Sequence, residues 1–286
     1  MMKQLIFMDI DGTLCDTAGE VPLSANRAIQ QAKSQGHDFY ICTGRSKPEL
    51  IPSILEIGFQ GIIGAGGGYV EIAGEVVEHL RLPKPAVLEI IAYFQQHNIG
   101  YYLESNDGLF GSDNCVSSII KQVTVGLVEE SLAYQEAIRE FDWFYDLLKE
   151  TKGIELDYGN VNKISFISNG HPFIEVAETF GDDFQMYRTT VPQFGNQSGE
   201  IAVKGINKQT AINKVLALTK HPQGQTMAYG DGNNDIAMFQ AVNYKVAMTN
   251  GTPELKALAD EITAIAEENG IANSLLRNGL LGKEIF

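Results

Sequence analysis

The feature that most constrains the fold of this chain is an alternation of short apolar segments with amphipathic segments at both of its ends. Near the N-terminus, residues 4–10, 38–42 and 61–65 form apolar runs that are typical of buried parallel strands. The stretch that begins at Ser24 and the stretch 47–57 are predicted to be helices between them. Strands that alternate with helices in this way predict an α/β fold, in which helices cover both faces of a parallel sheet.

The middle of the chain has a different pattern. Residues 69–72 and 75–80 predict a β-hairpin, and two prolines, Pro83 and Pro85, interrupt the pattern after it. Between residues 82 and 189 lie 16 of the 26 aromatic residues of the chain, which indicates a separate hydrophobic core. The elements predicted there are helices 86–97 and 136–149 and strands 100–104, 163–168 and 184–188. We therefore expect a small α+β domain in this region.

After Ser198 the first pattern resumes. The elements predicted there are strands 200–203, 226–229 and 244–247 and helices 207–218 and 234–241. The simplest organisation is a core with a Rossmann-like, doubly wound parallel sheet, built from residues 1–82 and 189–286. An α+β domain of residues 83–188 would be inserted into this core.

Composition excludes several classes of function. The chain carries 36 acidic and 21 basic residues, and the net charge of −15 disfavours nucleic acid and anionic membranes as partners. An acidic protein that binds an anionic substrate must gather positive charge locally, as a metal ion or as a few placed cations and backbone N–H groups. Cys15, Cys42 and Cys115 are odd in number and far apart, and the N-terminal apolar run is too short for a signal peptide or a membrane span. We therefore expect a cytoplasmic protein.

The segment Asp9-Ile10-Asp11-Gly12-Thr13 directly follows the first predicted strand. In a parallel sheet this position is the carboxyl edge, where open α/β sheets bind their ligands. Asp9 and Asp11 are two residues apart and in extended chain point to the same side, so a cation between or beside them is needed for both to ionise. Mg²⁺ is the natural candidate, because it prefers oxygen ligands and associates with phosphate.

A second acidic segment, residues 230–235 (GDGNND), also follows a predicted strand and opens a helix. Its carboxylates, Asp231 and Asp235, are therefore expected at the same edge of the sheet as the first segment. A turn rich in Asp, Asn and Gly that merely caps a helix would have a similar composition. The presence of both segments after strands favours a shared metal site over two unrelated turns.

Two further features indicate phosphate binding. Thr43-Gly44-Arg45 follows the second predicted strand and offers a hydroxyl and free amides at a helix start. Lys208 opens a later helix, where a cation opposes the helix dipole and so favours an anionic partner; Lys204 is an alternative for this role. Taken alone, a capping loop and a solvated lysine would explain the same residues.

In this order, the four elements resemble the haloacid dehalogenase (HAD) superfamily of phosphohydrolases, and specifically its Cof-type branch with a large inserted cap (class IIB). The elements are DxDGT, Thr-Gly-Arg, the lysine and GDGxND, and the resemblance covers essentially the whole chain. It implies a Mg²⁺-dependent phosphatase that hydrolyses phosphate monoesters of small metabolites, such as sugar phosphates, flavin mononucleotide or pyridoxal phosphate. The substrate and the oligomeric state stay open at this point.

The resemblance also implies a role for each matching residue. Asp9 would be the nucleophile that forms an aspartyl-phosphate, and Asp11 would protonate the leaving oxygen and then activate water. The implied metal ligands are Asp9, Asp11 through its backbone carbonyl, Asp231 and Asp235. The implied phosphate- and substrate-binding residues are Thr43, Gly44, Arg45, Lys208 and Asn234.

Residues 64–69 (GAGGGY) do not fit a dinucleotide-binding loop, because Tyr69 stands at the third glycine and a hairpin follows. Family members usually carry Asn-Gly-Ala near this place, and this chain has Gly66-Gly67-Gly68, so no substrate contact is carried over from that asparagine. In the inserted domain, Lys163 resembles the Lys-Ile element of Cof-type caps. Tyr187 is either a cavity-lining or, more simply, a core aromatic residue. Such a cap would exclude water and select the leaving group.

Two alternatives use the same residues. A phosphotransferase or mutase of the same superfamily would pass the phosphoryl group to a sugar, although an insert after the third strand favours the hydrolase branch. A receiver-like signalling protein also holds an aspartyl-phosphate with clustered Asp, Thr or Ser, Lys and Mg²⁺. The chain length, the Asp9 and Asp11 pair on the first strand and the inserted domain oppose the receiver.

Overall fold

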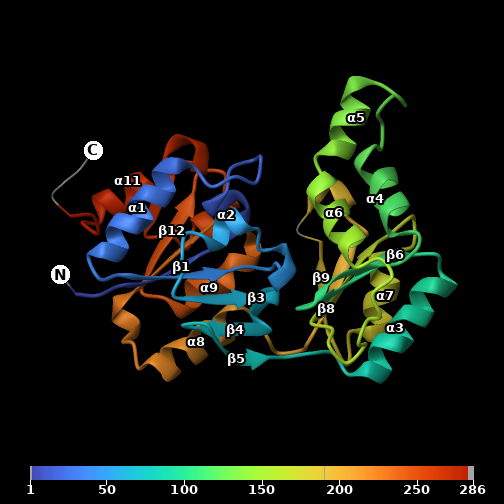
Figure 1. The fold of residues 1–286 in the computed structure, drawn as a ribbon, viewed down its shortest axis with the longest axis horizontal. Helices are drawn as coiled ribbons and strands as arrows, with labels where there is room; N and C mark the ends of the chain where they lie inside the picture. The colour runs from blue at the N-terminus through green and yellow to red at the C-terminus, as the bar shows by residue number, and fades with distance from the viewer. Residues whose placement is uncertain (1, 190, 283–286) are drawn as a thin grey trace. The chain divides into compact units, whose positions relative to one another are not determined.

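The computed structural model describes residues 2–189 and 191–282, which form two compact units (Figure 1). The first unit contains the chain up to Arg45, Leu50–His79 and the chain from Ile206 onward. The second unit contains Ser46–Glu49 and Leu80–Gly205. The chain therefore passes between the units at four places, and two of these lie within one short segment near residue 47.

The first unit is built on an eight-stranded sheet, counted over the described residues, with strand order β13-β12-β11-β1-β2-β3-β4-β5. The strands are β1 (Leu5–Met8), β2 (Asp38–Cys42), β3 (Gly61–Gly64), β4 (Tyr69–Ile72), β5 (Glu75–His79), β11 (Thr226–Gly230), β12 (Tyr244–Met248) and β13 (Glu261–Thr263). The six strands from β13 to β3 are parallel, and β4 and β5 add an antiparallel hairpin at the edge. Strand β1 lies between β2 and β11, so segments from the two ends of the chain are neighbours in this sheet.

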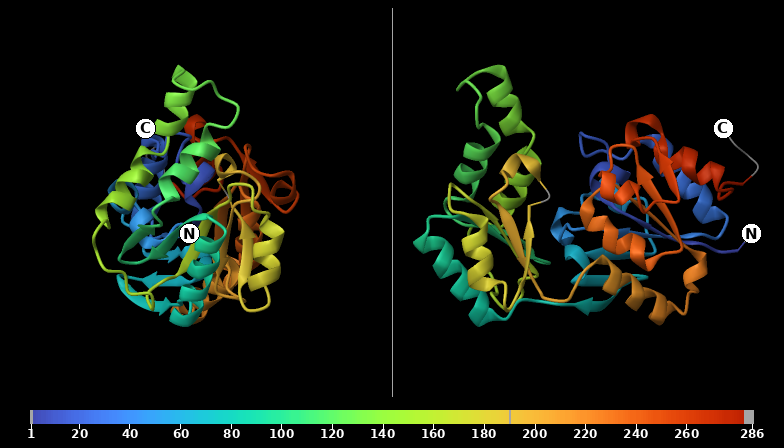
Figure 2. Two further views of the ribbon diagram at one scale, coloured as in Figure 1. Left: turned by 90° about the vertical axis from the view of Figure 1, so that its right-hand side faces the viewer. Right: turned by 180° about the vertical axis from the view of Figure 1, so that it is seen from behind.

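Helices cover both faces of this sheet (Figures 1 and 2). Successive side chains of a strand point to opposite faces, and β1 places Ile6 and Met8 in one apolar cluster and Leu5 and Phe7 in the other. The helices of the first face are α1 (Leu23–Ser34), α2 (Pro52–Leu55) and α11 (Gly270–Arg277). Those of the second face are α8 (Lys208–Thr219), α9 (Ile236–Ala241) and α10 (Pro253–Lys256). The predicted α/β class is confirmed.

The second unit is an α+β domain with an antiparallel sheet of strand order β7-β6-β8-β10-β9. The strands are β6 (Gly100–Ser105), β7 (Gly108–Gly111), β8 (Lys163–Ile167), β9 (Gln185–Arg188) and β10 (Gly199–Ala202). The helices are α3 (Lys84–Gln96), α4 (Cys115–Val123), α5 (Leu132–Arg139), α6 (Asp142–Glu150) and α7 (Phe173–Phe180). Helices α3 and α7 pack on one face of the sheet, and α4 and α6 pack on part of the other (Figure 2).

The assignment of the strand near residues 200–203 to the core is wrong. Strand β10 pairs with β8 and β9, so it belongs to the sheet of the second unit, which extends to Gly205 and not to residue 188. The sequence of β10 has one fully buried apolar side chain, Ile201, and such a short pattern indicates a strand without indicating which sheet it joins. Thr190 and residues 283–286 of the predicted core segment lie outside the described residues.

Two predicted helices are each divided in the structure. The prediction 47–57 becomes a short 3₁₀ turn at Lys47–Glu49 and helix α2, which begins at Pro52, where the missing N–H of proline costs nothing. The prediction 136–149 becomes α5 and α6. Within residues 2–189 and 191–282, no helix is both long and apolar enough to cross a membrane.

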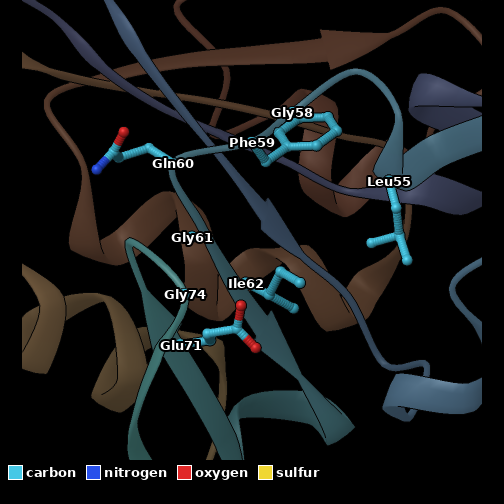
Figure 3. A pocket seen from close by; sticks show the side chains of 8 residues that line it. All are labelled: Leu55, Gly58, Phe59, Gln60, Gly61, Ile62, Glu71 and Gly74. Atoms are coloured by element: carbon cyan, nitrogen blue, oxygen red, sulfur yellow. The ribbon is translucent and has the colours of Figure 1, made fainter.

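Gly61 in β3 provides a test of the packing of the first unit. A Cβ at this position would lie 2.4 Å from the carbonyl oxygen of Glu71 on the neighbouring strand and 2.3 Å from the Tyr40 ring. Figure 3 shows Gly61 and Glu71 together in the wall of a small pocket. Because a backbone oxygen cannot move aside easily, we expect Gly61→Ala to destabilise the protein by about 1–3 kcal/mol, measured by urea unfolding.

The matched control is Gly224→Ala, since a Cβ there meets no atom within 4 Å. We expect its stability to stay within about 0.5 kcal/mol of the wild type. Equal stabilities for the two variants would contradict the packing described for β3 and β4.

Candidate active site

The candidate site begins at Asp9, the residue that follows β1. Its backbone N–H donates to the carbonyl of Tyr229 on β11 at 3.1 Å, so the parallel pairing continues up to this residue. The side chain is 5% exposed. Gly12, three residues further on, has φ +73°, and a Cβ there would lie 2.4 Å from Asp231 Oδ2. A glycine is therefore required at this point of the turn for the two acidic segments to approach each other.

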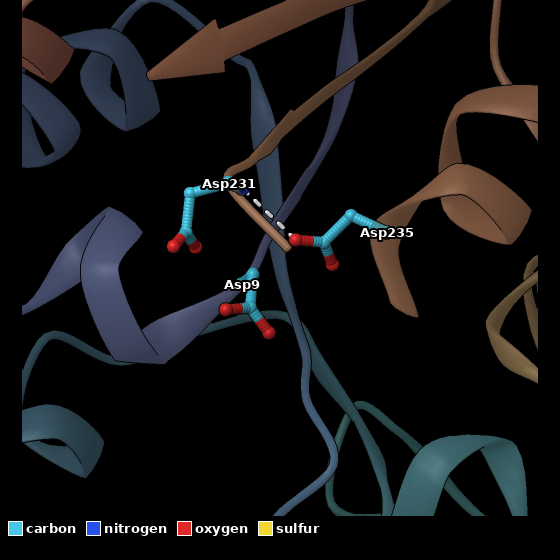
Figure 4. Close-up of side chains that lie close together, drawn as sticks. All are labelled: Asp9, Asp231 and Asp235. Atoms are coloured by element: carbon cyan, nitrogen blue, oxygen red, sulfur yellow. Dashed lines mark hydrogen bonds between the residues drawn. The ribbon is translucent and has the colours of Figure 1, made fainter. Parts of the chain in front are cut away.

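The second acidic segment follows β11 and holds its shape through Asp235. One oxygen of this carboxylate, Oδ2, accepts hydrogen bonds from the backbone N–H groups of Asp231 at 2.9 Å and Gly232 at 3.0 Å. The Asp231 carboxylate in turn accepts a bond from the Thr13 hydroxyl at 2.9 Å. Figure 4 shows Asp9, Asp231 and Asp235 converging from the two segments, as expected for loops at one carboxyl edge.

Lys208 connects the two segments. Its Nζ donates to Asp9 Oδ1 and to Asp235 Oδ1, both at 2.6 Å, and the side chain is almost completely buried. The lysine begins helix α8, and Asn207 caps this helix through a reciprocal capping box. Gly67 allows the close approach of this helix start, because a Cβ there would lie 2.4 Å from the Asn207 carbonyl oxygen.

The pKa values of these groups are shifted by their burial and by the charged side chains next to them. Burial alone would lower the pKa of Lys208, but the carboxylates of Asp235 and Asp9 keep it above its usual range, so the ammonium stays charged. Burial raises the pKa of Asp9 well above its usual range; Lys208 opposes this rise and Asp235 adds to it. Burial, with the nearby Asp235, also raises the pKa of Asp231 to about 6.

This charge distribution fits a divalent cation. Asp9, Asp231 and Asp235 each offer a carboxylate oxygen, and these oxygens lie within 4.8 Å of one another. Among the residues that the structure describes, the ammonium paired with these carboxylates is that of Lys208, which contacts Asp9 and Asp235, so negative charge is in excess at the site. Hard cations such as Mg²⁺ bind oxygen donors of this kind, and one of them would compensate the excess charge.

Asp11 is placed differently from the other three aspartates. Its carboxylate accepts two hydrogen bonds from Arg45, at 3.0 Å from Nε and 2.6 Å from a terminal nitrogen, and 64% of the Asp11 side chain is exposed. Arg45 belongs to the loop after β2, in which the Thr43 hydroxyl accepts the backbone N–H of Arg45 at 3.1 Å. The loop that carries Thr43 and Gly44 is thus joined to the loop that carries Asp9.

All the residues predicted for the site belong to the first unit, and they divide into three sets. The carboxylates of Asp9, Asp231 and Asp235 gather with the Lys208 ammonium. The Asp11 side chain pairs with Arg45, and the ligand proposed from this residue is its backbone carbonyl. The third set comprises Thr43, which is buried directly after β2, Gly44, which follows it and is partly buried, and Asn234, which is exposed in the 3₁₀ turn before α9.

Asn250 is a site residue that the sequence reasoning missed. Its side-chain amide donates to the Gly12 carbonyl at 2.9 Å and lies 3.4 Å from Asp231 Oδ2, so it supports both acidic segments. Asn250 comes two residues after β12, which ends at the same carboxyl edge. That position is the signal by which the sequence could have identified it.

Comparisons with known proteins identify the family of this chain and proteins that are similar to it. Residues 6–275 match the sequence model of a protein family described as "haloacid dehalogenase-like hydrolase". YkrA of Bacillus subtilis (strain 168) is 26% identical, over 98% of this chain and 100% of its own length. The 5-amino-6-(5-phospho-D-ribitylamino)uracil phosphatase YwtE of the same organism is 26% identical, over 93% of this chain and 95% of its own.

A solved structure described as the HAD subclass IIB sugar phosphatase BT4131 is similar to this chain, with a TM-score of 0.71 and 22% sequence identity. The match covers 98% of this chain and 100% of that chain. The resemblance drawn from the four motifs is thereby confirmed for family and fold. The family match spans nearly the whole chain, and the chain belongs to the haloacid dehalogenase-like hydrolases.

Proposed function

We propose that this protein is a Mg²⁺-dependent phosphatase that hydrolyses phosphate monoesters of small metabolites through a phosphorylated Asp9. The observation that carries the proposal is the buried Asp9 carboxylate, held at 2.6 Å by Lys208 among two further carboxylates. A carboxylate is a weak nucleophile unless it is kept ionised and pointed at the phosphorus atom. Lys208 supplies a fixed positive charge for both purposes.

Asp11 suits the proton-transfer steps. Its exposed side chain is within reach of a leaving group and of solvent, while the two bonds from Arg45 restrict its orientation. In this assignment, Asp11 gives a proton to the leaving oxygen when the aspartyl-phosphate forms. It then removes a proton from the water that hydrolyses the aspartyl-phosphate.

The transferring phosphoryl group needs donors for its equatorial oxygens. We assign this role to the Thr43 hydroxyl, the Gly44 amide, Lys208 and the Asn234 amide. Thr43 and Lys208 are buried, which strengthens their interaction with a charge that develops in the transition state. Arg45 contributes through Asp11 in this assignment.

Mg²⁺ would be held by Asp9, the Asp11 backbone carbonyl and Asp231, with Asp235 in support. Both oxygens of Asp235 already accept bonds from Lys208 and from two backbone N–H groups, which favours a supporting role over direct ligation. When bound, the ion supplies charge neutralisation at the transferring phosphoryl group.

The names of two relatives support small phosphorylated metabolites as the substrate class. YwtE acts, by its name, on a phosphorylated ribitylamino compound, and BT4131 is described as a sugar phosphatase. We therefore expect phosphorylated sugars and polyols, with flavin mononucleotide and pyridoxal phosphate, as the compounds to test. All three cysteines are free and buried, which is consistent with the cytoplasmic location that we propose.

The first test is phosphate release from these compounds by the wild type and by Asp9→Asn, each with Mg²⁺ and with chelator. The variant removes the nucleophilic oxygen with little change of shape, so we expect release to fall by at least ~10³-fold. Chelation should abolish wild-type release to a similar extent.

The matched control is Asp146→Asn. Asp146 belongs to the second unit, and both it and Lys149, with which it forms an ion pair, are exposed at the surface. We expect the rate of this variant to equal that of the wild type. Release by Asp9→Asn at the wild-type rate, or wild-type release that continues in chelator, would contradict the proposal. Failure of the wild type to release phosphate from any of the compounds would also contradict it.

The pH dependence of stability gives a second test. The Asp231 carboxyl has a pKa of about 6 in the folded protein against an ordinary value of 3.8, so the folded state holds the proton more tightly than the unfolded state. Its contribution to stability therefore falls as pH rises from about 4 to about 6 and is constant above that range. Asp231→Asn removes this effect.

In chelator, we expect the melting temperature of Asp231→Asn, relative to the wild type, to rise across this pH range and then level off. Added Mg²⁺ at neutral pH should raise the melting temperature of the wild type more than that of the variant. A melting-temperature difference that is independent of pH, or that falls as pH rises, would show that the pKa of the partly buried Asp231 carboxyl is not raised in the folded protein.

A further inference from the structure

The loop after β12, residues 249–252, lies in the first unit and contacts both acidic segments of the candidate site. Thr252 fixes this loop to the second acidic segment. Its backbone N–H donates to the Asp231 carbonyl at 2.9 Å, and its hydroxyl donates to Asn233 Oδ1 at 2.6 Å. The same hydroxyl accepts the N–H of Leu255 and so caps helix α10.

Gly251 allows the loop to lie this close to the second segment. A Cβ at this position would lie 2.9 Å from the carbonyl oxygen of Met248 and 3.2 Å from that of Asp231. Both of these atoms belong to the backbone, which cannot turn aside as a flexible side chain can. The residue before this glycine, Asn250, is thereby held next to the site.

The side chain of Asn250 connects the loop to the first acidic segment. Its Nδ2 donates to the carbonyl oxygen of Gly12 at 2.9 Å, and the same nitrogen lies 3.4 Å from Asp231 Oδ2. The other oxygen of this carboxylate, Oδ1, accepts a bond from the Thr13 hydroxyl at 2.9 Å. A donor therefore contacts each oxygen of Asp231, and both donors link this carboxylate to the first segment.

This arrangement orients Asp231 separately from the other two carboxylates. Lys208 orients Asp9 and Asp235, whereas Thr13 and Asn250 orient Asp231. A carboxylate oxygen has more than one acceptor position, so the donors leave room for a cation at Asp231. Partners that orient a metal-binding side chain reduce the cost of bringing the ligands together, and their loss weakens metal binding.

We propose that Asn250 is a positioning residue for the Mg²⁺ site. It holds the Asp231 carboxylate against the first acidic segment and thereby sets the affinity for the ion, while its own amide adds no charge. This inference rests on the proposed function, in which Asp9 and Asp231 hold Mg²⁺. The competing explanation is that Asn250 only secures the loop 249–252.

The two explanations differ in what the loss of the amide changes. If Asn250 only secures the loop, Asn250→Ala lowers the melting temperature in chelator and leaves the Mg²⁺ affinity of the folded protein unchanged. If Asn250 positions Asp231, the affinity itself falls. The Asn250 side chain is exposed, so its truncation leaves no cavity in the apolar core and the variant is expected to fold.

The test is isothermal titration of Mg²⁺ into the wild type and into Asn250→Ala, both without substrate. We expect the dissociation constant of the variant to be ~10-fold higher. The Mg²⁺ concentration that gives half-maximal phosphate release should rise by the same factor, while kcat at saturating Mg²⁺ stays close to the wild-type value. A dissociation constant that is unchanged or lower in Asn250→Ala would overturn the proposal.

The matched control is Thr252→Val, which loosens the same loop without touching the Asp231 carboxylate. It removes the hydroxyl that bonds Asn233 and caps α10, and it keeps the backbone N–H that donates to Asp231. We expect its melting temperature to fall and its Mg²⁺ affinity to match that of the wild type. A loss of affinity equal to that of Asn250→Ala would show that the affinity depends on the loop as a whole, against the proposal.

Two further points keep the outcome clear. If Asn250→Ala does not fold, Asn250→Ser removes the same amide and gives the same comparison. A wild type that binds no Mg²⁺ would refute the metal site of the proposed function. Normal wild-type binding together with equal affinity in the Asn250 variants would refute this inference alone.

Discussion

The structure of the site depends on one buried interaction, the pair of bonds from Lys208 to Asp9 and Asp235. These residues come from three distant parts of the sequence, and each bond is 2.6 Å long. A buried ammonium between two carboxylates costs solvation, which is recovered only if the geometry is exact enough to satisfy every partner. The pairing of β1 with β11, the capping box at Asn207 and the close approach allowed by Gly67 all serve this geometry.

The same interaction explains how a protein with a net charge of −15 can be suited to an anionic substrate. The carboxylates at the site are arranged so that the positive charges of one lysine and one metal ion would compensate their negative charge. Anions are then attracted only where the cation is held. The net negative charge of the chain disfavours binding of polyanions such as nucleic acid.

Much of the first unit and its site could be predicted from the sequence, because the relevant signals are local. The apolar run before Asp9 and the turn residues around Asp231 specify strand ends, and the ends of parallel strands meet at one edge. The sequence could not assign β10 to its sheet, since strand pairing is a long-range choice that a four-residue pattern does not encode. It also could not reveal the bonds from Arg45 to Asp11, because side-chain pairs between loops leave no periodic pattern.

The central claim is that the Asp9 carboxylate attacks phosphorus, and the most direct measurement is to identify the phosphorylated residue. Wild-type protein with Mg²⁺ and its best substrate would be quenched in acid within the first turnover, digested and analysed by mass spectrometry. We expect phosphate on the peptide that contains Asp9, at the aspartate itself, and loss of this phosphorylated peptide once the substrate has been consumed. Phosphate on any other residue, or turnover with no phosphorylated peptide at any quench time, would contradict it.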